Sequence, residues 1–231
     1  MKDVTIVLPV CLIDQELIDS TSKCANQLAD NTPRNLYDLV LIENGSLAVG
    51  IQDFDLRDDV TYIRTANPLG AARPFNMGVA LARTRYAVFM SNDVYVTPGW
   101  LEGLLTAYQK HGSGIVAPEE TAGRPDWTPN AHWGACFLTE RSLWESMGGW
   151  DEVNFPWRYC DQDMSIRMTK LGFHVGRTGL SVVEHKNMLT VNKMQDIIAP
   201  HAARERERML ELYGAAEFDE WIRLRTQVTN G

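Results

Sequence analysis

The fold of this chain is decided by the stretch YAVFMSNDVYVTPGWLEGLL, residues 86–105. It opens with five apolar or aromatic residues, continues with three polar ones, and has Pro98 at a position where helices commonly begin. This pattern predicts a strand over residues 86–90, a turn at Ser91, Asn92 and Asp93, and a helix over residues 98–110.

The same alternation of strand and helix patterns extends to both sides of this stretch. On the N-terminal side we predict strands over residues 4–10, 39–42 and 60–64, and helices over 16–29 and 70–83. On the C-terminal side we predict strands over 112–118, 134–139, 173–178 and 180–184, and helices over 140–147, 161–171, 201–213 and 217–226. Residues 187–200 show no clear pattern. Such alternation predicts an α/β fold with a mainly parallel sheet.

Length and composition support a single globular unit. The chain has 231 residues, 45% of them apolar, and a formal net charge of −8, which excludes a disordered chain, a collagen and a disulfide miniprotein. No linker is visible, so we expect one domain over residues 1–200 with a helical tail over 201–231 packed on it. The acidic balance disfavours broad binding of nucleic acid.

Cysteine usage and the N-terminal sequence bear on the compartment. The four cysteines form no Cys-x-x-Cys pair, so we predict reduced thiols and a cytoplasmic protein. The opening MKDVTIVLPV lacks the pattern of a signal peptide, and no run approaches about 20 apolar residues. We therefore expect neither a cleaved leader nor a membrane span.

Polar residues follow several of the predicted strands. In an open parallel sheet, ligands bind outside the carboxyl ends of the strands, which points to residues 9–12, 43–46, 67–70 and 91–94. Two of these segments contain acids, Glu43 and Asp93. A carboxylate at such a place suits Mg²⁺ or Mn²⁺ bridging to phosphates. From strand position alone, the simpler role of Asp93 is to cap a turn.

A second group of acids lies further along the chain. Asp151 and Glu152 precede Asp161 and Asp163, which are two residues apart and so point in different directions from a helix. At a helix start one of them can cap the N-terminus while the other reaches into a cleft, although both can also serve only as caps. His185 closes an apolar strand, and a histidine with a carboxylate is a workable Mn²⁺ site.

Tryptophans and other aromatic residues gather in two segments. One segment holds Trp127, His132 and Trp133, and the other holds Trp150, Phe155, Trp157 and Tyr159. Exposed tryptophans suit the stacking of sugar rings and equally suit protein partners. Trp144, in a short predicted helix, is expected in the core.

The order of these segments resembles the nucleotide-sugar glycosyltransferases of the GT-A fold, in the inverting family-two group. The likeness runs from about Val4 to His185. The family's opening strand is similar to VTIVLPV (4–10), and its V-D-N-G-S is similar to VLIENGS (40–46), with Glu43 in place of Asp. Its N-x-G-x-A-x-A-R-N-x-G is similar to NPLGAARPFNMG (67–78).

The likeness continues through the second half of the chain. The family's L-D-x-D-V-x-V-x-P-x-W-L resembles VFMSNDVYVTPGWLEGLL (88–105), and its acceptor-side segment resembles GACFLTERSLWESMGGWDE (134–152). Its E-D-x-D segment resembles YCDQDMSIRMTKLGFHV (159–175), and its histidine-ending strand resembles VVEH (182–185). The resemblance implies a Rossmann-like three-layer sandwich whose central mixed sheet is mostly parallel, followed by C-terminal helices.

The resemblance also implies roles for individual residues. Glu43 is implied to contact the nucleobase, Asp93 and His185 to bind Mn²⁺ or Mg²⁺, and Asp161 to act as the general base. Two positions depart from the family pattern: Ser91 stands for the first Asp of D-x-D, and Cys160 for the Glu before the base.

The remaining site residues divide between two sides. The expected donor-binding residues are Pro9, Val10, Glu43, Asn44, Gly70, Arg73, Asn76, Ser91, Asn92 and Lys186. The expected acceptor-side or sugar-side residues are Trp133, Gly134, Trp150, Asp151, Trp157 and Asp163, although a role in starting and orienting the following helix is the main one expected of Asp163. Lys186 and residues 187–200 are predicted to form a lid over the diphosphate.

These roles describe a metal-dependent inverting glycosyltransferase. A carboxylate at Glu43 can accept the N3–H of uracil or thymine, or the N1–H of guanine. The family resemblance implies UDP-sugars as the first expectation, with GDP and dTDP sugars as alternatives. The acceptor is open among a glycan or lipid-linked saccharide, a protein, a small molecule and a hydroxylated nucleobase. A non-catalytic nucleotide-sugar-binding module is an alternative, because Ser91 and Cys160 replace two acids. A nucleotidyltransferase would need a Gly-rich basic loop after the first strand, which PVCLIDQEL lacks.

Overall fold

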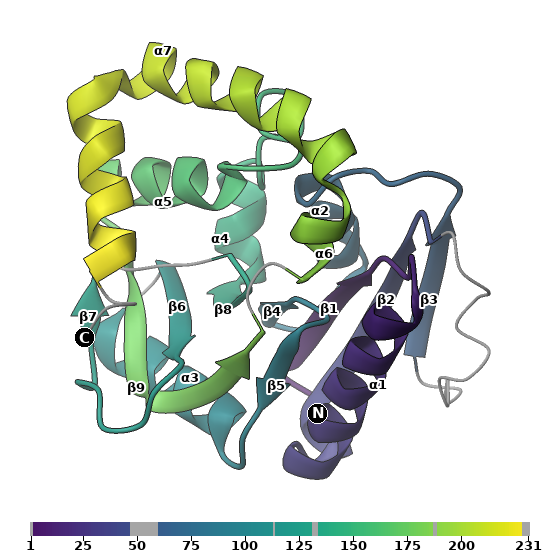
Figure 1. The fold of residues 1–231 in the computed structure, drawn as a ribbon. Coiled ribbons are helices and arrows are strands. Elements are labelled where there is room, and N and C mark those ends of the chain that lie inside the picture. Colours follow the sequence, from purple (N-terminus) through teal and green to yellow (C-terminus); the bar gives the residue numbers. More distant parts are fainter. Residues whose placement is uncertain (1, 47–59, 113, 131–133, 187–188, 228–231) are drawn as a thin grey trace.

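A computed structural model describes residues 2–46, 60–112, 114–130, 134–186 and 189–227 (Figure 1). The strands are β1 (Val4–Val10), β2 (Tyr37–Asn44), β3 (Val60–Thr65), β4 (Tyr86–Met90), β5 (Val94–Val96), β6 (Gly114–Glu119), β7 (Thr128–Pro129), β8 (Cys136–Glu140) and β9 (His174–His185). The α-helices are α1 (Gln15–Asn31), α2 (Ala72–Leu81), α3 (Trp100–His111), α4 (Arg141–Ser146), α5 (Cys160–Lys170), α6 (Leu189–Lys193) and α7 (Gln195–Gln227).

The strands form one mixed sheet in the order β3-β2-β1-β4-β8-β6-β9-β5, with β7 paired to β9. The first four strands of this order run parallel to one another. β8 is antiparallel to both of its neighbours, β4 and β6, while β9 is parallel to β6. The α/β prediction is confirmed, and the antiparallel pairings are confined to the half of the sheet that follows β4.

Helices cover both faces of the sheet, which gives three layers (Figure 1). Side chains alternate along a strand, and on β1 Ile6 and Leu8 pack with α1 and α3 while Val7 packs on the other face with α2. That second face also receives α4 and α5. Trp144 is buried there, as predicted, with its ring centroid 4.9 Å from that of Phe75.

Several elements after β4 differ from the prediction. Val94–Val96, for which no element was predicted, is strand β5, and it pairs with the end of β9. The two short strands predicted over residues 173–178 and 180–184 are instead one strand, β9, which runs from His174 to His185. β9 is continuous because its first part pairs with β6 and its last part pairs with β5, so different partners stabilise its two ends.

Residues 189–200 also differ from the prediction. They showed no pattern in the sequence, yet they form α6 and the first turn of α7. Met194 and Ile198 are buried and pack against Cys11 at the end of β1. This small apolar contact across the chain, rather than a local periodicity, accounts for their helical structure.

The C-terminal helices lie along α5 and close the second face (Figure 1). α7 begins at Gln195 and bends at Gly214, whose φ of 76° and ψ of 160° are not helical, so its two arms correspond to the two predicted tail helices. Met209 and Phe218 are buried in the same apolar cluster as α5, so the tail packs on the main core. None of the helices in the described part of the chain has the length and hydropathy of a membrane-crossing segment.

Candidate active site

Two adjoining cavities lie at the carboxyl ends of β1 and β4. The first, here called the central cavity, has a volume of about 210 Å³. The predicted site residues that line it are Ser91, Asn92, Asp93, Gly134, Trp150, Trp157, Asp161 and His185. The second, the side cavity, has a volume of about 160 Å³, shares Ser91, Asn92 and Trp157 with the first, and adds Pro9, Val10, Asn44 and Gly70. The structure therefore brings together both predicted metal ligands and the predicted base.

Asp93 and His185 meet because β5 pairs with the end of β9, which sets Val94 opposite His185. Asp93 is buried, and its Oδ1 lies 3.4 Å from His185 Nε2. The other ring nitrogen of His185, Nδ1, lies 3.3 Å from Glu120 Oε1. Burial by itself lowers the pKa of His185, but the hydrogen bonds with Asp93 and Glu120 outweigh it and raise the pKa to about 9.

The spacing of these two side chains fits one divalent cation. Two ligand atoms that bind an ion at about 2.1 Å are about 3.0 to 3.4 Å apart at octahedral or tetrahedral angles. The Asp93 and His185 atoms satisfy this condition, and the Glu120 carboxylate can fix the ring orientation from the far nitrogen. In the described residues no three His, Cys, Asp or Glu side chains form a metal-binding cluster.

Neighbouring residues hold the end of β4 in place. Asn92 Nδ2 donates to Thr21 Oγ1 over 2.8 Å, and Asn92 Oδ1 accepts from Thr190 Oγ1 over 3.4 Å. The Ser91 amide donates to the carbonyl of Ala135 over 2.7 Å. These bonds tie the segment just before Asp93 to α1, to α6 and to the residue that precedes β8.

Asp161 lies in the first turn of α5 and is buried. Its Oδ2 accepts the Gly134 amide proton over 3.0 Å. A Cβ on Gly134 would lie 2.9 Å from that same oxygen, so the close approach of the two segments requires glycine. Just before the helix, Tyr159 has a φ of 58°, which is a left-handed conformation that tyrosine rarely adopts.

The turn before α5 is held from the side of α2. The carbonyl of Pro156 accepts the amide protons of Ala71 over 2.7 Å and Ala72 over 3.2 Å. Gly70 has a φ of +88°, and a Cβ there would lie 2.1 Å from the Pro156 oxygen. A glycine at position 70 is therefore required by both its backbone conformation and its neighbour.

The same turn is held from the other side by α7. Glu205 is only 3% exposed and accepts the amide protons of Arg158 over 2.6 Å and of Trp157 over 3.2 Å. Burial raises the pKa of Glu205 to about 7, although these bonds and nearby arginines act in the opposite direction. Sequence reasoning missed Glu205, because it assigned no site residue to the predicted helices over 201–213 and 217–226. Its helical spacing of three or four residues from the apolar Ala202 and Met209 is the signal that could have revealed it.

Glu43 and Asn44, at the end of β2, are both engaged inside the protein. The Glu43 carboxylate is fully buried, accepts the Tyr62 hydroxyl at Oε2 and lies 3.6 Å from Arg64 Nε at Oε1. Glu43 is not among the residues that line either cavity. Asn44 bonds to the amide of Leu69 over 2.8 Å and to the carbonyl of Gly70 over 2.9 Å, which fixes the loop before α2.

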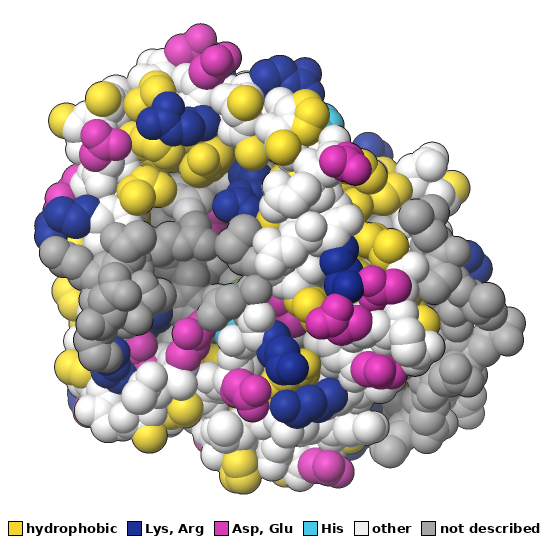
Figure 2. All heavy atoms as spheres, in the orientation of Figure 1, with side chains coloured by type: hydrophobic (Ala, Val, Ile, Leu, Met, Phe, Trp, Pro, Cys, Tyr) yellow, Lys and Arg dark blue, Asp and Glu magenta, His cyan; other side chains and the backbone are white. Residues whose placement is uncertain are grey.

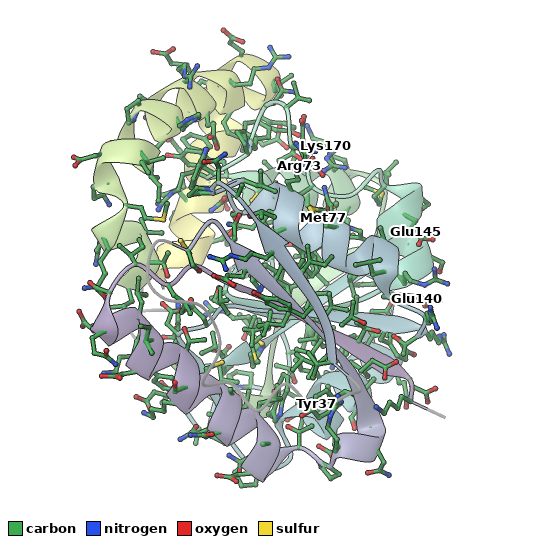
Figure 3. The ribbon with its side chains drawn as sticks, turned by 90° about the vertical axis from the view of Figure 1, so that its right-hand side faces the viewer. Tyr37, Arg73, Met77, Glu140, Glu145 and Lys170 are labelled. Carbon is green, nitrogen blue, oxygen red and sulfur yellow. The ribbon has the colours of Figure 1, made fainter. Side chains whose placement is uncertain are left out.

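Two predicted donor-side residues on α2 lie outside both cavities. Asn76 makes four hydrogen bonds of 2.9 to 3.2 Å, which reach Trp144, Trp150 and Glu152. Arg73 lies on the α2 surface turned to the viewer in Figure 3, with its Nε 3.7 Å from Glu152. Both side chains tie α2 to the segment after α4.

Two predicted acceptor-side acids also lie outside the cavities. Asp151 accepts the amide protons of Val153 and Asn154 and so stabilises its own turn. Asp163 accepts the Tyr213 hydroxyl over 2.6 Å and pairs with Arg167 over 2.7 Å.

The last two predicted residues complete the placement. Lys186 is exposed beside the site, and its amide donates to the Asp93 carbonyl over 3.0 Å. Trp133, like His132, lies outside the described residues.

Comparison with known proteins agrees with this architecture. The solved structure described as GalNAc-T7 with UDP, GalNAc and Mn²⁺ superposes with a TM-score of 0.69 at 13% identity, covering 80% of this chain and 44% of that one. S. aureus TarS (residues 1–349) superposes with a TM-score of 0.63 at 13% identity, covering 87% of this chain and 65% of that one. The molecule therefore has the GT-A fold.

Sequence comparison gives the family. The profile described as Glycosyl transferase family 2 matches residues 5–170, so the chain belongs to glycosyl transferase family 2. The uncharacterized protein Rv1525 of Mycobacterium tuberculosis is 26% identical over 148 residues, which are 54% of this chain. The match spans 56% of that relative, so this chain corresponds to little more than half of its length.

Proposed function

We propose that this protein is a divalent-metal-dependent, inverting glycosyltransferase that moves a sugar from a nucleoside diphosphate to an acceptor hydroxyl. The observation that carries the proposal is the central cavity, in which Asp93 and His185 share a lining with Asp161. Asp93 and His185 are suited to hold a cation beside the leaving diphosphate. The separate carboxylate of Asp161 is suited to remove the proton of the acceptor hydroxyl. Membership of glycosyl transferase family 2 supports the same reaction class.

The side cavity is the proposed donor-nucleotide region. It adjoins the central cavity and is bounded by the ends of β1 and β2 and by the Gly70 loop, the place where open α/β sheets bind ligands. GalNAc-T7 is solved with UDP and Mn²⁺, and TarS with UDP-GlcNAc. These neighbours support a UDP-sugar as donor, with GDP and dTDP sugars as the alternatives. The helical segment 189–193, whose Thr190 and Val191 line both cavities, is the proposed cover.

In the proposed mechanism Asp161 accepts the proton of the acceptor hydroxyl, which attacks the anomeric carbon opposite the leaving diphosphate and so inverts it. A base in this role must lie within hydrogen-bond reach of the hydroxyl. Gly134 holds one oxygen of Asp161, which fixes the direction of the carboxylate. Asp93 and His185 would hold Mn²⁺ or Mg²⁺, which when bound neutralises charge on the diphosphate. Trp157 lines both cavities and is placed to stack on a sugar ring.

Glu43 is the proposed reader of the nucleobase. A carboxylate accepts the N3–H of uracil or thymine and the N1–H of guanine, but it offers no donor to N1 of adenine. Tyr62 occupies Oε2, so Oε1, which has no hydrogen bond within the described part of the chain, is the atom that this role would use. Arg64 Nε lies 3.6 Å from this oxygen. Because the Arg64 side chain is 57% exposed, it has room to adjust when a base binds to Oε1.

A non-catalytic nucleotide-sugar-binding module is the second candidate, and one observation favours it. Cys160 replaces an acid of the family pattern, and burial raises the pKa of its thiol well above the ordinary value, so this residue stays neutral.

The four cysteines are free thiols, and all are buried, which supports a reducing compartment such as the cytoplasm.

On the face shown in Figure 2, Lys and Arg side chains are mixed with Asp and Glu, which argues against a broad nucleic-acid surface.

Two measurements test the proposal. Calorimetric titration with UDP, GDP, dTDP and ADP, each with and without Mn²⁺, should show metal-dependent binding of one of the first three and weaker binding of ADP. Incubation with a panel of UDP-sugars and acceptor classes should then release UDP. Binding without any sugar transfer or donor hydrolysis would favour the module, and tight metal-independent binding of ADP would contradict the assignment of Glu43 and Asp93.

A further inference from the structure

Glu205 is a buried acid that the proposed chemistry does not use. It comes from α7, beyond the residues matched by the family, and it faces the turn that leads into α5. The residues of that turn, Trp157, Arg158 and Tyr159, line the central cavity together with Asp161. One carboxylate thus connects the C-terminal helix to the segment that carries the proposed base.

The contacts are specific to the backbone of the turn. Arg158 N donates to Glu205 Oε2 over 2.6 Å, and Trp157 N lies 3.2 Å from Oε1 and 3.4 Å from Oε2. Two consecutive amide protons therefore converge on one carboxylate. On the opposite side, the carbonyl of Pro156 is held by Ala71 and Ala72. The turn is thus held from two sides. The start of α2 binds its carbonyl at Pro156, and α7 binds its amides at Trp157 and Arg158.

This arrangement is costly for the folded protein. Burial raises the pKa of Glu205 to about 7, which means that the charged form is disfavoured inside. The left-handed Tyr159 adds backbone strain in the same turn. An apolar or neutral residue in the buried stripe of α7 would avoid the first of these costs. A carboxylate at position 205 is explained if the conformation of the turn that it holds is needed for function.

We propose that Glu205 is a positioning residue, which fixes the turn over residues 157–159 so that Asp161 and Trp157 face the acceptor hydroxyl. The inference rests on the proposed glycosyltransferase function, because it needs Asp161 to be the base. It assigns Glu205 no contact with the substrate. Its effect should therefore fall on turnover and leave nucleotide binding intact, since the side cavity is lined largely by other elements.

The test uses three variants of the full chain. Glu205→Ala removes both acceptor oxygens. Glu205→Gln keeps the shape and one acceptor, but it turns an amide group toward a second N–H donor. Glu207→Gln is the matched control, because Glu207 lies two residues away on the same helix, is exposed and loses the same charge.

Three readouts separate a positioning role from a merely structural one. Hydrogen exchange at the amides of Trp157 and Arg158 should speed up about 10-fold or more in both Glu205 variants and stay unchanged in Glu207→Gln. The kcat for hydrolysis of the UDP-sugar that the wild type turns over fastest should fall about 10–100-fold in Glu205→Ala and less in Glu205→Gln, with the donor KM unchanged. Calorimetric affinity for UDP with Mn²⁺ should not change, and Glu205→Gln should melt no lower than wild type at pH 8.

The outcomes distinguish this inference from the proposed function. If wild-type protein neither binds UDP with Mn²⁺ nor consumes any donor, the proposed function fails and the inference fails with it. If wild-type protein does both, while Glu205→Gln keeps full kcat or normal exchange at the two amides, the inference alone is overturned. A fall in kcat that simply follows a lower melting temperature would assign Glu205 a structural role and overturn it as well.

Discussion

The two walls of the central cavity are built in different ways. The wall with Asp93 is the end of a parallel strand, and its neighbours are set by strand pairing along β4, β5 and β9. The wall with Asp161 is a turn and a helix start, and hydrogen bonds from α2, β8 and α7 hold it. One acid is placed by a sheet and the other by side chains and glycines distant in the sequence.

The comparison shows where chemical function and packing are coupled. A sheet end tolerates changes in its surroundings, because many backbone bonds share the task of holding it. The turn before α5 depends on a few contacts, namely Gly70, Gly134 and Glu205, so single substitutions should disturb it. We therefore expect the Asp161 wall to be the more sensitive of the two to changes outside the cavity.

The largest effect should come from Asp161 itself. Asp161→Asn keeps the shape and still accepts the Gly134 amide proton, but it cannot take a proton from the acceptor. Sugar transfer should fall by about 10²–10⁴-fold with donor binding and melting temperature nearly unchanged. Steady-state kinetics and a thermal melt on this variant measure both. A near-normal rate would leave Asp161 with only a structural role, as the acceptor of the Gly134 amide proton in the first turn of α5.

On the opposite wall, Asp93→Ala should remove metal-dependent binding of the nucleotide. Loss of a charged ligand should weaken UDP binding in the presence of Mn²⁺ by about 100-fold or more, and His185→Ala should weaken it less, because a neutral ligand is lost. Calorimetry with UDP and Mn²⁺ compares the two variants. If Asp93→Ala retains wild-type affinity, the metal assignment is wrong and the two walls do not divide the chemistry as proposed.

Asn76 and Asn44 allow two supports around the Asp161 wall to be compared by their effect on stability. Asn76→Ala should cost about 3 kcal/mol, because it leaves the Trp144 indole N–H and the Trp150 amide and carbonyl without their partner. Asn44→Ala, which breaks two bonds to the loop before α2, should cost about 2 kcal/mol. Urea unfolding of both variants gives the difference. Equal costs would show that these two supports are equally firm.

The smallest effect is a pH dependence of stability at Glu205. Its pKa is raised from 4.5 to about 7 in the folded protein, so the contribution to stability is complete below about pH 4.5 and is lost as pH rises through 7. The groups that face it are the amides of Trp157 and Arg158 and the guanidinium groups of Arg158 and Arg204. The melting temperature of Glu205→Gln minus that of wild type should therefore increase from pH 4.5 to 7 and then level off. A constant difference would mean that folding does not shift the pKa of Glu205.

Local patterns predicted the sheet of the N-terminal half well. Alternating or continuous apolar runs mark β1, β2, β3 and β4, and the polar residues that follow them reach the cavities as expected, as Asp93 and Asn44 do. The family resemblance, now shown by the profile match, correctly placed the chain among the family-two enzymes of the GT-A fold. These features are encoded within a few consecutive residues, so a single sequence is enough to find them.

The remaining features depend on contacts between distant residues. No local pattern around Val94 indicates that it pairs with His185, the last residue of β9. Likewise, no local pattern around Met194 indicates that it packs on Cys11. The engagement of Glu43 by Tyr62 and Arg64 depends on the register of β2 and β3, which sequence patterns do not supply. The roles of the predicted site residues, including Glu43, Lys186 and Trp133, stay predictions.

The position of α7 has a consequence for protein engineering. The family profile ends at Lys170, but His185 lies on β9 and Glu205 on α7, both beyond that boundary. A chimera that exchanges only the profile-matched segment between relatives would join the transferred turn over residues 157–159 to the recipient's own C-terminal helix, which need not provide the matching carboxylate. Grafting experiments should therefore transfer residues up to at least Met209 together with the matched segment, because Met209 packs in the same apolar cluster as α5.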